Sequence, residues 1–541
     1  MIHLFIFNNK SRAANYGIGT YVRQLTDGIR ALQNAQIKVS FVDLYADAKE
    51  YSITNDERGL LHYQIPVLYP GMENETFCRC AFYFLARHIK KEKGVQLVFH
   101  FNYFQHLPLA VLLKGQYVDC RILLTVHYLS WCFDLKGNKT VFRQIAAKGY
   151  RPQNEKEKNV LESIKQEREF LHLVDEIIVL SKDTNSILVK NYYVSECKIH
   201  LIYNGLGDEL CLDEKKGIKK RMILFVGRLD EIKGVNFLIN AFQKIAPKYP
   251  DTHLIIIGDG NFQEYLPLSQ GLMGRISFWG RMSKDKIEGI YKSAYIGVMP
   301  SFHEQCSYTA IEMMRHRIPI IGTDSTGLAE MFDLTPELCV HIDENNMIDQ
   351  DFIEQIFSRM DLLLSNNEVY MRAADAFGKL YNTRYKVSSM VDGTLNAIKV
   401  SLNRQNYTIS GDYLKHIDTC LIRLINKHPD IDLDFYGITG IGVYLWKRVL
   451  DLSKEGKDLY HIAFIQEHLI YFLDWVSELT NDSELFPNEM LALLQDMKRT
   501  GFYITCVEKL LNIQSVSDVA LNIPSDRTII QNALKICNCK I

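Results

Sequence analysis

Short runs of consecutive apolar residues recur along the chain, and longer stretches with helical periodicity separate them. A run of this kind is typical of a strand that is buried on both faces of a parallel sheet. These runs predict strands at residues 2–7, 39–44, 97–100, 122–126, 176–180, 223–226, 254–257, 296–299 and 318–322. Strands that alternate with helices in this way predict an α/β fold with two doubly wound, Rossmann-like domains.

Helical periodicity is clearest after the first predicted strand and after Lys233. The first of these helices is expected to bury one face, made of Tyr21, Leu25, Ile29 and Leu32. The second shows an apolar stripe that matches the 3.6-residue period more closely, at Val235, Leu238, Ile239, Phe242 and Ile245.

Residues 203–207 contain two glycines and precede the charged stretch 213–220, which together mark a linker between two halves. The sequence therefore predicts an N-terminal Rossmann-like domain at 1–205 and a second one at 206–402, which ends in a return helix. Beyond about residue 402 the composition changes, and Leu414, Ile417, Leu421 and Leu424 share one helical face. An all-α module is predicted at 403–541, which is long enough for a core of its own.

Composition and charge are those of a large globular protein. With 541 residues, 47% of them hydrophobic, the chain is longer than one core usually supports. A net charge of −2 gives no overall attraction to nucleic acid or to an anionic membrane. No stretch approaches the ~18 apolar residues of a spanning helix, and the first residues lack the features of a signal peptide. A cytoplasmic location with reduced cysteines is expected.

One basic stretch leaves a second interpretation open. Peripheral membrane contact is one role for these side chains, and a solvated loop is the other; they are Lys136, Lys139, Arg143, Lys148 and Arg151.

The most specific chemical signal is a pair of carboxylates at residues 304 and 312, within the segment 300–312. A predicted strand ends just before this segment, and a helix is predicted from Thr309. Glu304 therefore lies in a loop and Glu312 on a helix, so the two carboxylates are expected to do different jobs. The backbone N–H groups near the helix start are suited to an anion or a sugar hydroxyl; they belong to Gln305, Cys306 and Ser307.

Glycines follow the first strand of the first predicted domain, and cations follow the first strand of the second. Arg228 and Lys233 are placed to neutralise the charge of a diphosphate. Gly17 and Gly19 allow close backbone approach to a phosphate at the start of a helix. The third glycine of the dinucleotide fingerprint is missing, which disfavours a nicotinamide enzyme.

The segment 300–312 resembles the E-x7-E motif of the family 4 glycosyltransferases, which are retaining enzymes of the two-domain GT-B class. Further similar segments follow the family's order at 225–234, 257–260 and 323–330, and the resemblance covers roughly residues 1–400. Where that family usually has Gly-Phe-Gly after the first glutamate, this chain has Gln305, Cys306 and Ser307. The departure affects the donor sugar rather than the fold.

The resemblance implies a role for each matching residue. Arg228 and Lys233 stabilise the leaving diphosphate in place of a metal, so no metal or other cofactor is expected. Glu304 binds hydroxyls of the donor sugar and Glu312 binds the ribose, while His127 positions the sugar. The remaining matches are expected to bind the donor; they are Gly258, Gly280 beside the base and Glu330 near the diphosphate.

The resemblance implies a retaining, hexosyltransferase-type enzyme that uses a UDP- or GDP-sugar. The acceptor stays open among a glycan, a lipid-linked sugar and a peptide. The alternative is a non-catalytic scaffold that binds sugar nucleotides and recruits a protein partner through the helical module. Residues 436–445 of that module resemble the glycine-rich turn of lanthionine-cyclase-like helical repeats.

Overall fold

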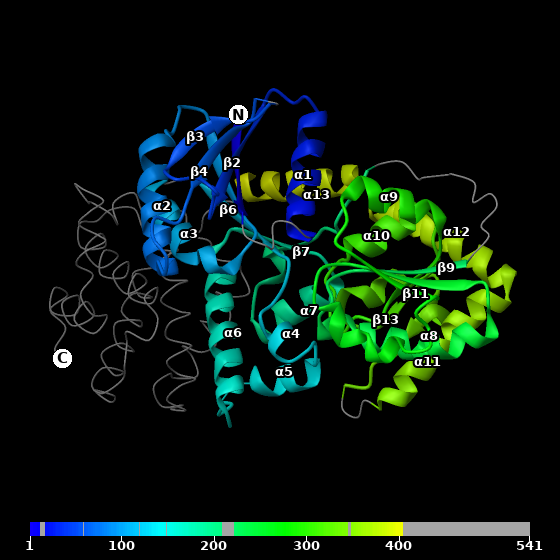
Figure 1. Ribbon diagram of the computed structural model, residues 1–541. Coiled ribbons are helices and arrows are strands. Elements are labelled where there is room, and N and C mark those ends of the chain that lie inside the picture. The colour runs from blue at the N-terminus through cyan, green and yellow to red at the C-terminus, as the bar shows by residue number, and fades with distance from the viewer. Residues whose placement is uncertain are drawn as a thin grey trace.

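The computed structural model describes residues 1–10, 17–57, 59–117, 120–147, 149–207, 221–344 and 348–403. Two α/β domains lie side by side, each built on one sheet (Figure 1). The predicted module at 403–541 lies outside the described residues from 404 onward.

The N-terminal domain contains an eight-stranded sheet in the order β3-β4-β2-β1-β5-β6-β7-β8. All neighbouring strands are parallel except β3 and β4. The strands are β1 (Ile2–Asn9), β2 (Ile37–Leu44), β3 (Ser52–Asn55), β4 (Leu61–Ile65), β5 (Gln96–Phe101), β6 (Arg121–Val126), β7 (Glu176–Val179) and β8 (Ile199–Leu201). The helices are α1 (Gly17–Ala31), α2 (Asn74–His88), α3 (Leu107–Gln116), α4 (Trp131–Asp134), α5 (Lys139–Ile145), α6 (Glu155–Leu173) and α7 (Lys182–Asn191).

The second domain contains a six-stranded parallel sheet in the order β11-β10-β9-β12-β13-β14. Its strands are β9 (Arg221–Val226), β10 (Thr252–Ile257), β11 (Ile276–Gly280), β12 (Ala294–Met299), β13 (Ile320–Thr323) and β14 (Cys339–Val340). The helices that follow are α8 (Val235–Lys248), α9 (Lys284–Ser293), α10 (Tyr308–Arg315), α11 (Asp349–Ser365), α12 (Asn367–Arg384) and α13 (Val387–Asn403).

All the predicted strands are present, and the two-domain α/β fold is confirmed. The apolar stripe predicted on α8 is fully buried. The prediction for the first helix was wrong at Leu32, which is 49% exposed, because α1 ends at Ala31 and Gln33 has a positive φ of 47°. The strands that the sequence did not reveal are short or lie toward the sheet edges: β3, β4, β8, β11 and β14.

The chain passes between the domains twice, and the two passages lie together. Leu206 N donates to Tyr385 O at 2.9 Å, and Leu206 forms an isolated parallel bridge with Lys386. After the second passage α13 returns to the N-terminal domain and packs beside α1 (Figure 1). The Arg121 side chain on β6 donates through Nε to the Ser401 carbonyl at 3.0 Å. The last described helix therefore belongs spatially to the first domain.

Candidate active site

A cleft between the domains is lined by residues that follow the carboxyl ends of strands in both sheets, as expected for doubly wound folds. It has two adjoining lobes of about 710 and about 700 Å³. One lobe, called the aromatic lobe, contains Tyr45, Tyr103, Tyr128 and Phe133. The other, called the basic lobe, contains Arg23, Arg281 and Lys284. Both lobes share Gly17, Ile18, His127, Arg228, Lys233, Glu304 and Gln305.

Lys233 and Glu304 form an ion pair where the two lobes meet. Lys233 Nζ donates to Glu304 Oε1 at 2.6 Å, and the two side chains are 16% and 15% exposed. The loops that carry them are joined by the Phe302 N–H, which donates to the Ile232 carbonyl at 2.8 Å. The Glu304 carbonyl also accepts from Gly327 N at 2.8 Å. Two residues 71 positions apart are thus held with little freedom to move.

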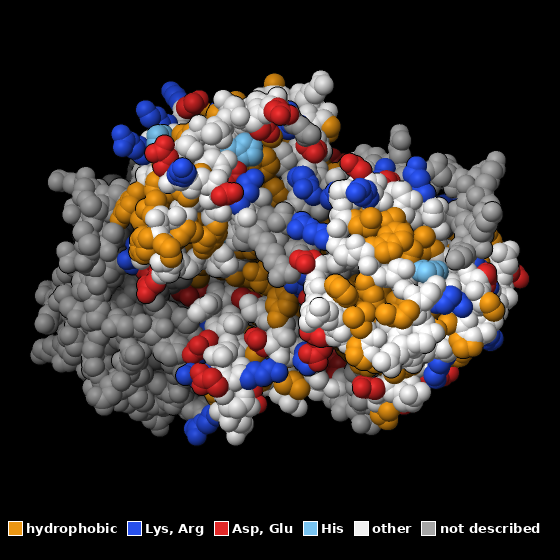
Figure 2. Space-filling view, in the orientation of Figure 1, with side chains coloured by type: hydrophobic (Ala, Val, Ile, Leu, Met, Phe, Trp, Pro, Cys, Tyr) orange, Lys and Arg blue, Asp and Glu red, His pale blue; other side chains and the backbone are white. Residues whose placement is uncertain are grey.

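Arg228 supplies a second cation to both lobes. Its guanidinium is 40% exposed and lies 3.0 Å from Asp230 Oδ2, measured from Nη2. Behind it the backbone is tightly packed, because a Cβ on Gly258 would lie 1.6 Å from the Gly227 carbonyl oxygen. Only glycine fits there, so the ends of β9 and β10 approach each other closely. Figure 2 shows Lys and Arg side chains gathered where the domains meet.

Glu312 lies in the basic lobe, on α10. The helix begins after Ser307, whose hydroxyl accepts from Ala310 N. Glu312 Oε2 accepts a hydrogen bond from the Tyr291 hydroxyl at 2.8 Å. Burial raises the pKa of this carboxyl, while the Tyr291 hydrogen bond and Lys284 act in the opposite direction. The hydrogen bond from Tyr291 to Oε2 therefore also fixes the direction of the other carboxylate oxygen, Oε1.

The segment that departs from the expected Gly-Phe-Gly contacts the first domain. Gln305 Oε1 accepts from the hydroxyls of Ser181, at 3.2 Å, and Thr184 at the start of α7. The Cys306 carbonyl accepts from Asn204 Nδ2 at 2.6 Å. Burial raises the pKa of the Cys306 thiol to about 12, so the thiol stays protonated at neutral pH. All three residues of this segment line the basic lobe.

His127 follows β6 and is held in one tautomer by its neighbour. The Asn102 amide donates through Nδ2 to the Phe7 carbonyl at 3.0 Å, so its Oδ1 faces His127 Nε2 at 2.9 Å. An oxygen acceptor requires Nε2 to carry the proton, which leaves Nδ1 as an acceptor. Burial lowers the pKa of His127 to about 3, so the ring is neutral at physiological pH.

The remaining residues predicted for the site do not all line the cleft. Gly17 lines both lobes, whereas Gly19 is buried within α1. Gly280 ends β11 and accepts from Gly258 N at 3.0 Å. Glu330 is buried between the domains, where its carboxylate accepts from Lys182 N and from the Tyr203 hydroxyl. Gly19, Gly280 and Glu330 are absent from the described lining of either lobe, and the contacts of Glu330 are those of an interdomain tie.

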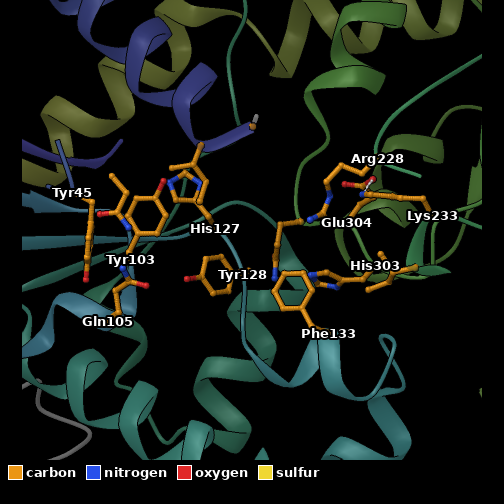
Figure 3. Close-up of a pocket in the computed structure, with 15 residues that line it drawn as sticks. Tyr45, Tyr103, Gln105, His127, Tyr128, Phe133, Arg228, Lys233, His303 and Glu304 are labelled. Atoms are coloured by element: carbon orange, nitrogen blue, oxygen red, sulfur yellow. Dashed lines mark hydrogen bonds and ion pairs between the residues drawn. The ribbon is translucent and has the colours of Figure 1, made fainter. Parts of the chain in front are cut away.

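Sequence reasoning missed the aromatic lobe. Figure 3 shows Tyr45, Tyr103 and Tyr128 on one side of the cleft, opposite Arg228 and Lys233. The three tyrosines follow the carboxyl ends of β2, β5 and β6 within two residues. Their positions after predicted strands were the signal available in the sequence.

Two of the basic side chains suggested for membrane contact lie next to acidic side chains of the protein itself. Lys136 pairs with Glu231 at 2.5 Å, and Lys139 lies 3.6 Å from Asp183. Arg143 and Arg151 are exposed, and Lys148 lies outside the described residues. Among the helices that the structure describes, none combines the length and hydropathy of a membrane span.

We expect stability to fall on acidification from pH 6.5, because burial lowers the pKa of several histidines far below the unfolded value of about 6.5. These values are about 4 for His100 and about 3 for His106, His127 and His303. Between the folded values and about pH 6.5, the unfolded chain binds more protons than the folded protein, so acidification favours unfolding. The raised pKa values of Glu167 and Glu312 act in the opposite direction but involve fewer groups. Melting temperatures at pH 7.5, 6.0 and 5.0 test this, and a constant value would contradict it; His106→Gln should weaken the dependence.

Two protein-family models match the chain. One, described as Glycosyltransferase Family 4, matches residues 16–210, and the other, Glycosyl transferases group 1, matches residues 220–362. Together they cover more than half of the sequence.

Curated relatives match about a third of the chain. An uncharacterized glycosyltransferase of Methanocaldococcus jannaschii is 30% identical over 172 residues, 29% of this chain and 44% of the relative. The mannosylfructose-phosphate synthase of Agrobacterium fabrum is 27% identical over 195 residues, 32% of this chain and 43% of the relative. The chain thus spans less than half the length of these relatives.

Solved structures share the fold at low sequence identity. Sucrose-phosphate synthase from Thermosynechococcus elongatus has a TM-score of 0.58 at 17% identity, covering 74% of this chain and 99% of that one. Anabaena HepE, solved in complex with UDP-glucose, has a TM-score of 0.54 at 11% identity, with the same coverage of both chains.

Proposed function

The chain belongs to the family 4-like glycosyltransferases of the GT-B class, and we propose on that premise that its cleft transfers a hexosyl group from a UDP- or GDP-sugar to an acceptor hydroxyl. One observation carries the proposal. Arg228, Lys233 and Glu304 meet at the junction of the two lobes, and Lys233 and Glu304 lie 2.6 Å apart. A sugar whose reacting carbon lies there would have Arg228 and Lys233 on one side. The Glu304 carboxylate would accept hydrogen bonds from the sugar hydroxyls.

The basic lobe is the proposed donor site. Glu312 and the residues after β9, β10 and β12 line it, and a carboxylate of this kind accepts ribose hydroxyls. HepE, which shares the fold, was solved with UDP-glucose, a donor of the proposed class. Arg228 and Lys233 would then lie at the diphosphate, between the donor and the aromatic lobe.

The proposed reaction retains the configuration at the sugar carbon. The bond between C1 and the diphosphate oxygen breaks, and its electron pair stays on that oxygen. The acceptor hydroxyl oxygen bonds to C1 on the same face, and its proton passes to the departing phosphate. Arg228 and Lys233 stabilise the charge that develops on the diphosphate, so no metal is assigned to this step. The Glu304 carboxylate accepts hydrogen bonds from hydroxyls of the sugar. Nδ1 of neutral His127 accepts a hydrogen bond from a further sugar hydroxyl.

The non-catalytic alternative is not favoured. A scaffold that only binds a nucleotide does not require Lys233 and Glu304 at the junction of two lobes, whereas transfer between two substrates does. The role predicted for 403–541, recruitment of an acceptor or a protein partner, lies outside the described residues.

We expect the purified protein to hydrolyse at least one donor slowly when it is incubated with UDP-glucose, UDP-galactose, UDP-N-acetylglucosamine and GDP-mannose. Glu312→Gln should weaken the affinity for UDP or GDP about tenfold, because a hydrogen bond to a charged group contributes about 1.5–3 kcal/mol. Calorimetry measures this dissociation constant.

The matched control is Glu354→Gln, an exposed glutamate on α11 that pairs with Lys244 and should bind nucleotide like the wild type. Equal dissociation constants for wild type and Glu312→Gln would contradict the ribose role. Failure to bind or hydrolyse any donor would contradict the proposed function.

A further inference from the structure

The wall of the aromatic lobe that the N-terminal domain supplies is uncharged among the described residues. Its described residues are Asn9, Gly17, Ile18, Tyr45, Tyr103, Gln105, His127, Tyr128 and Phe133. The cations of this lobe, Arg228 and Lys233, lie on the opposite wall (Figure 3). These two are already assigned to the donor diphosphate, so the described residues of the N-terminal wall offer no counter-charge to a second phosphate.

Two buried polar atoms on this wall have no hydrogen-bond partner among the described residues. They are Asn9 Oδ1 and the Tyr103 hydroxyl, on side chains of residues that are 2% and 3% exposed. A buried polar group without a partner is destabilising, so its presence calls for an explanation. A bound molecule with hydroxyl groups would satisfy both atoms, since a hydroxyl donates to the amide oxygen and accepts from the phenol.

The Tyr45 hydroxyl on the same wall differs from Asn9 and Tyr103 because it already has a partner. The Tyr45 hydroxyl donates to Asn74 Oδ1 at 2.9 Å, and Asn74 Nδ2 donates to the Gln105 carbonyl at 2.7 Å. One face of the Tyr45 ring stacks on Phe77 with a centroid distance of 4.2 Å. These contacts fix the Tyr45 ring and the backbone at Gln105 in the absence of any ligand.

Aromatic rings extend from this wall to the reaction centre. Tyr128 and Phe133 meet edge to face with centroids 5.7 Å apart, and Phe133 is 47% exposed. The Phe133 ring also meets the edge of His303, the residue before Glu304, at 6.5 Å. Apolar ring faces beside a few polar groups are suited to a sugar ring, which presents C–H groups on its faces and hydroxyls at its rim.

Given the proposed transferase activity, we propose that the acceptor in the aromatic lobe is an unphosphorylated sugar ring at the end of a neutral glycan or glycoside. The ring lies against Tyr128 and Phe133, and its hydroxyls bond to Asn9 and Tyr103. The mannosylfructose-phosphate synthase among the relatives is named for a phosphorylated product. A neutral acceptor would give this chain a product unlike the phosphorylated one in that name.

The test uses the full chain, a radiolabelled donor that it hydrolyses, and an array of immobilised acceptors. The array pairs each neutral glycan with a phosphorylated counterpart and includes serine- and threonine-containing peptides. Label on neutral glycans, at least tenfold above their phosphorylated counterparts, is the expected result. Label only on phosphorylated sugars or peptides, or on nothing while the donor is still hydrolysed, overturns the inference and leaves the proposed function standing. Loss of donor hydrolysis itself would instead contradict the proposed function.

Tyr103→Phe separates acceptor recognition from folding. Because the hydroxyl has no partner in the described structure, its removal should leave the melting temperature no lower than that of the wild type. The KM for the best soluble neutral glycoside should rise about five- to tenfold, the equivalent of about 1–1.4 kcal/mol, while the dissociation constant for UDP or GDP stays the same. Tyr69→Phe, at a tyrosine that is 52% exposed and outside the described cleft lining, is the matched control. Equal KM values for the two variants would overturn the assignment of Tyr103.

Discussion

Replacing Lys233 by alanine is expected to lower kcat by ~10²-fold or more, because the charge on the departing diphosphate would lose a fixed cation. Lys233 is largely buried and its Nζ lies 2.6 Å from Glu304 Oε1, so little solvent is available to replace it. Single-turnover and steady-state rates with the hydrolysed donor measure the loss. A chelator should leave the wild-type rate unchanged, since the side-chain cations are assigned this role.

The control for this change is Lys248→Ala. Lys248 pairs with Asp361 at 2.5 Å, its side chain is 52% exposed, and it lies at the end of α8 outside the described cleft lining. Its loss should leave the rate within about twofold of the wild type, because an exposed ion pair contributes only about 0–1 kcal/mol. Activity that EDTA abolishes and manganese restores would refute the assignment of the diphosphate charge to Arg228 and Lys233.

Glu304→Gln is expected to slow transfer by ~10²-fold, through loss of a charged contact that holds the sugar in place for reaction. Nucleotide affinity should change less than threefold, because Glu304 lies at the junction of the lobes and the proposed ribose contact is Glu312. Calorimetry with UDP or GDP and steady-state kinetics separate the two effects. A loss of nucleotide affinity as large as that of Glu312→Gln would contradict the division of roles.

The two changes are also expected to be non-additive. Lys233 and Glu304 are hydrogen-bonded, so removing one alters the other, and residues in direct contact commonly show coupling energies of about 0.5–3 kcal/mol. The double variant should therefore lose less activity than the product of the single losses. Strict additivity would indicate that the ion pair has no part in catalysis.

The positions of the long strands could be predicted from the sequence, because runs such as 223–226 and 254–257 are apolar without interruption. The short strands could not. β3 has an exposed residue at three of its four positions, and β11 is exposed toward its end, so neither shows a buried run. Pairing with a neighbouring strand, rather than an apolar pattern, defines them.

The candidate site was predicted only in part. The separation of 71 residues between Lys233 and Glu304 hides their ion pair from any local pattern. The resemblance placed Glu330 near the diphosphate, yet its contacts are with Lys182 N and Tyr203 at the domain junction. Tyr103 and Tyr128 were missed because single tyrosines after strands are common, and only the folded sheet brings them to one wall.

The segment of Gln305, Cys306 and Ser307 shows why its departure from the family pattern leaves the fold intact. Gln305 replaces a small glycine with a side chain that reaches Ser181 and Thr184 of the other domain. The loop before α10 is therefore fastened to α7 by side-chain contacts. Its backbone still leads into the same helix, with Ser307 as the capping residue.

The return of α13 to the first domain makes the end of the described chain part of that domain. Its last turn is bonded through Ser401 to Arg121 at the amino end of β6, whereas Tyr128 follows the carboxyl end of the same strand. α13 is thereby fastened at the edge of the sheet opposite the cleft, and the passages at Leu206 and Tyr385 are the described chain connections between the domains. If the two domains move relative to each other, these two passages act as the hinge, and α13 moves with the N-terminal wall of the aromatic lobe.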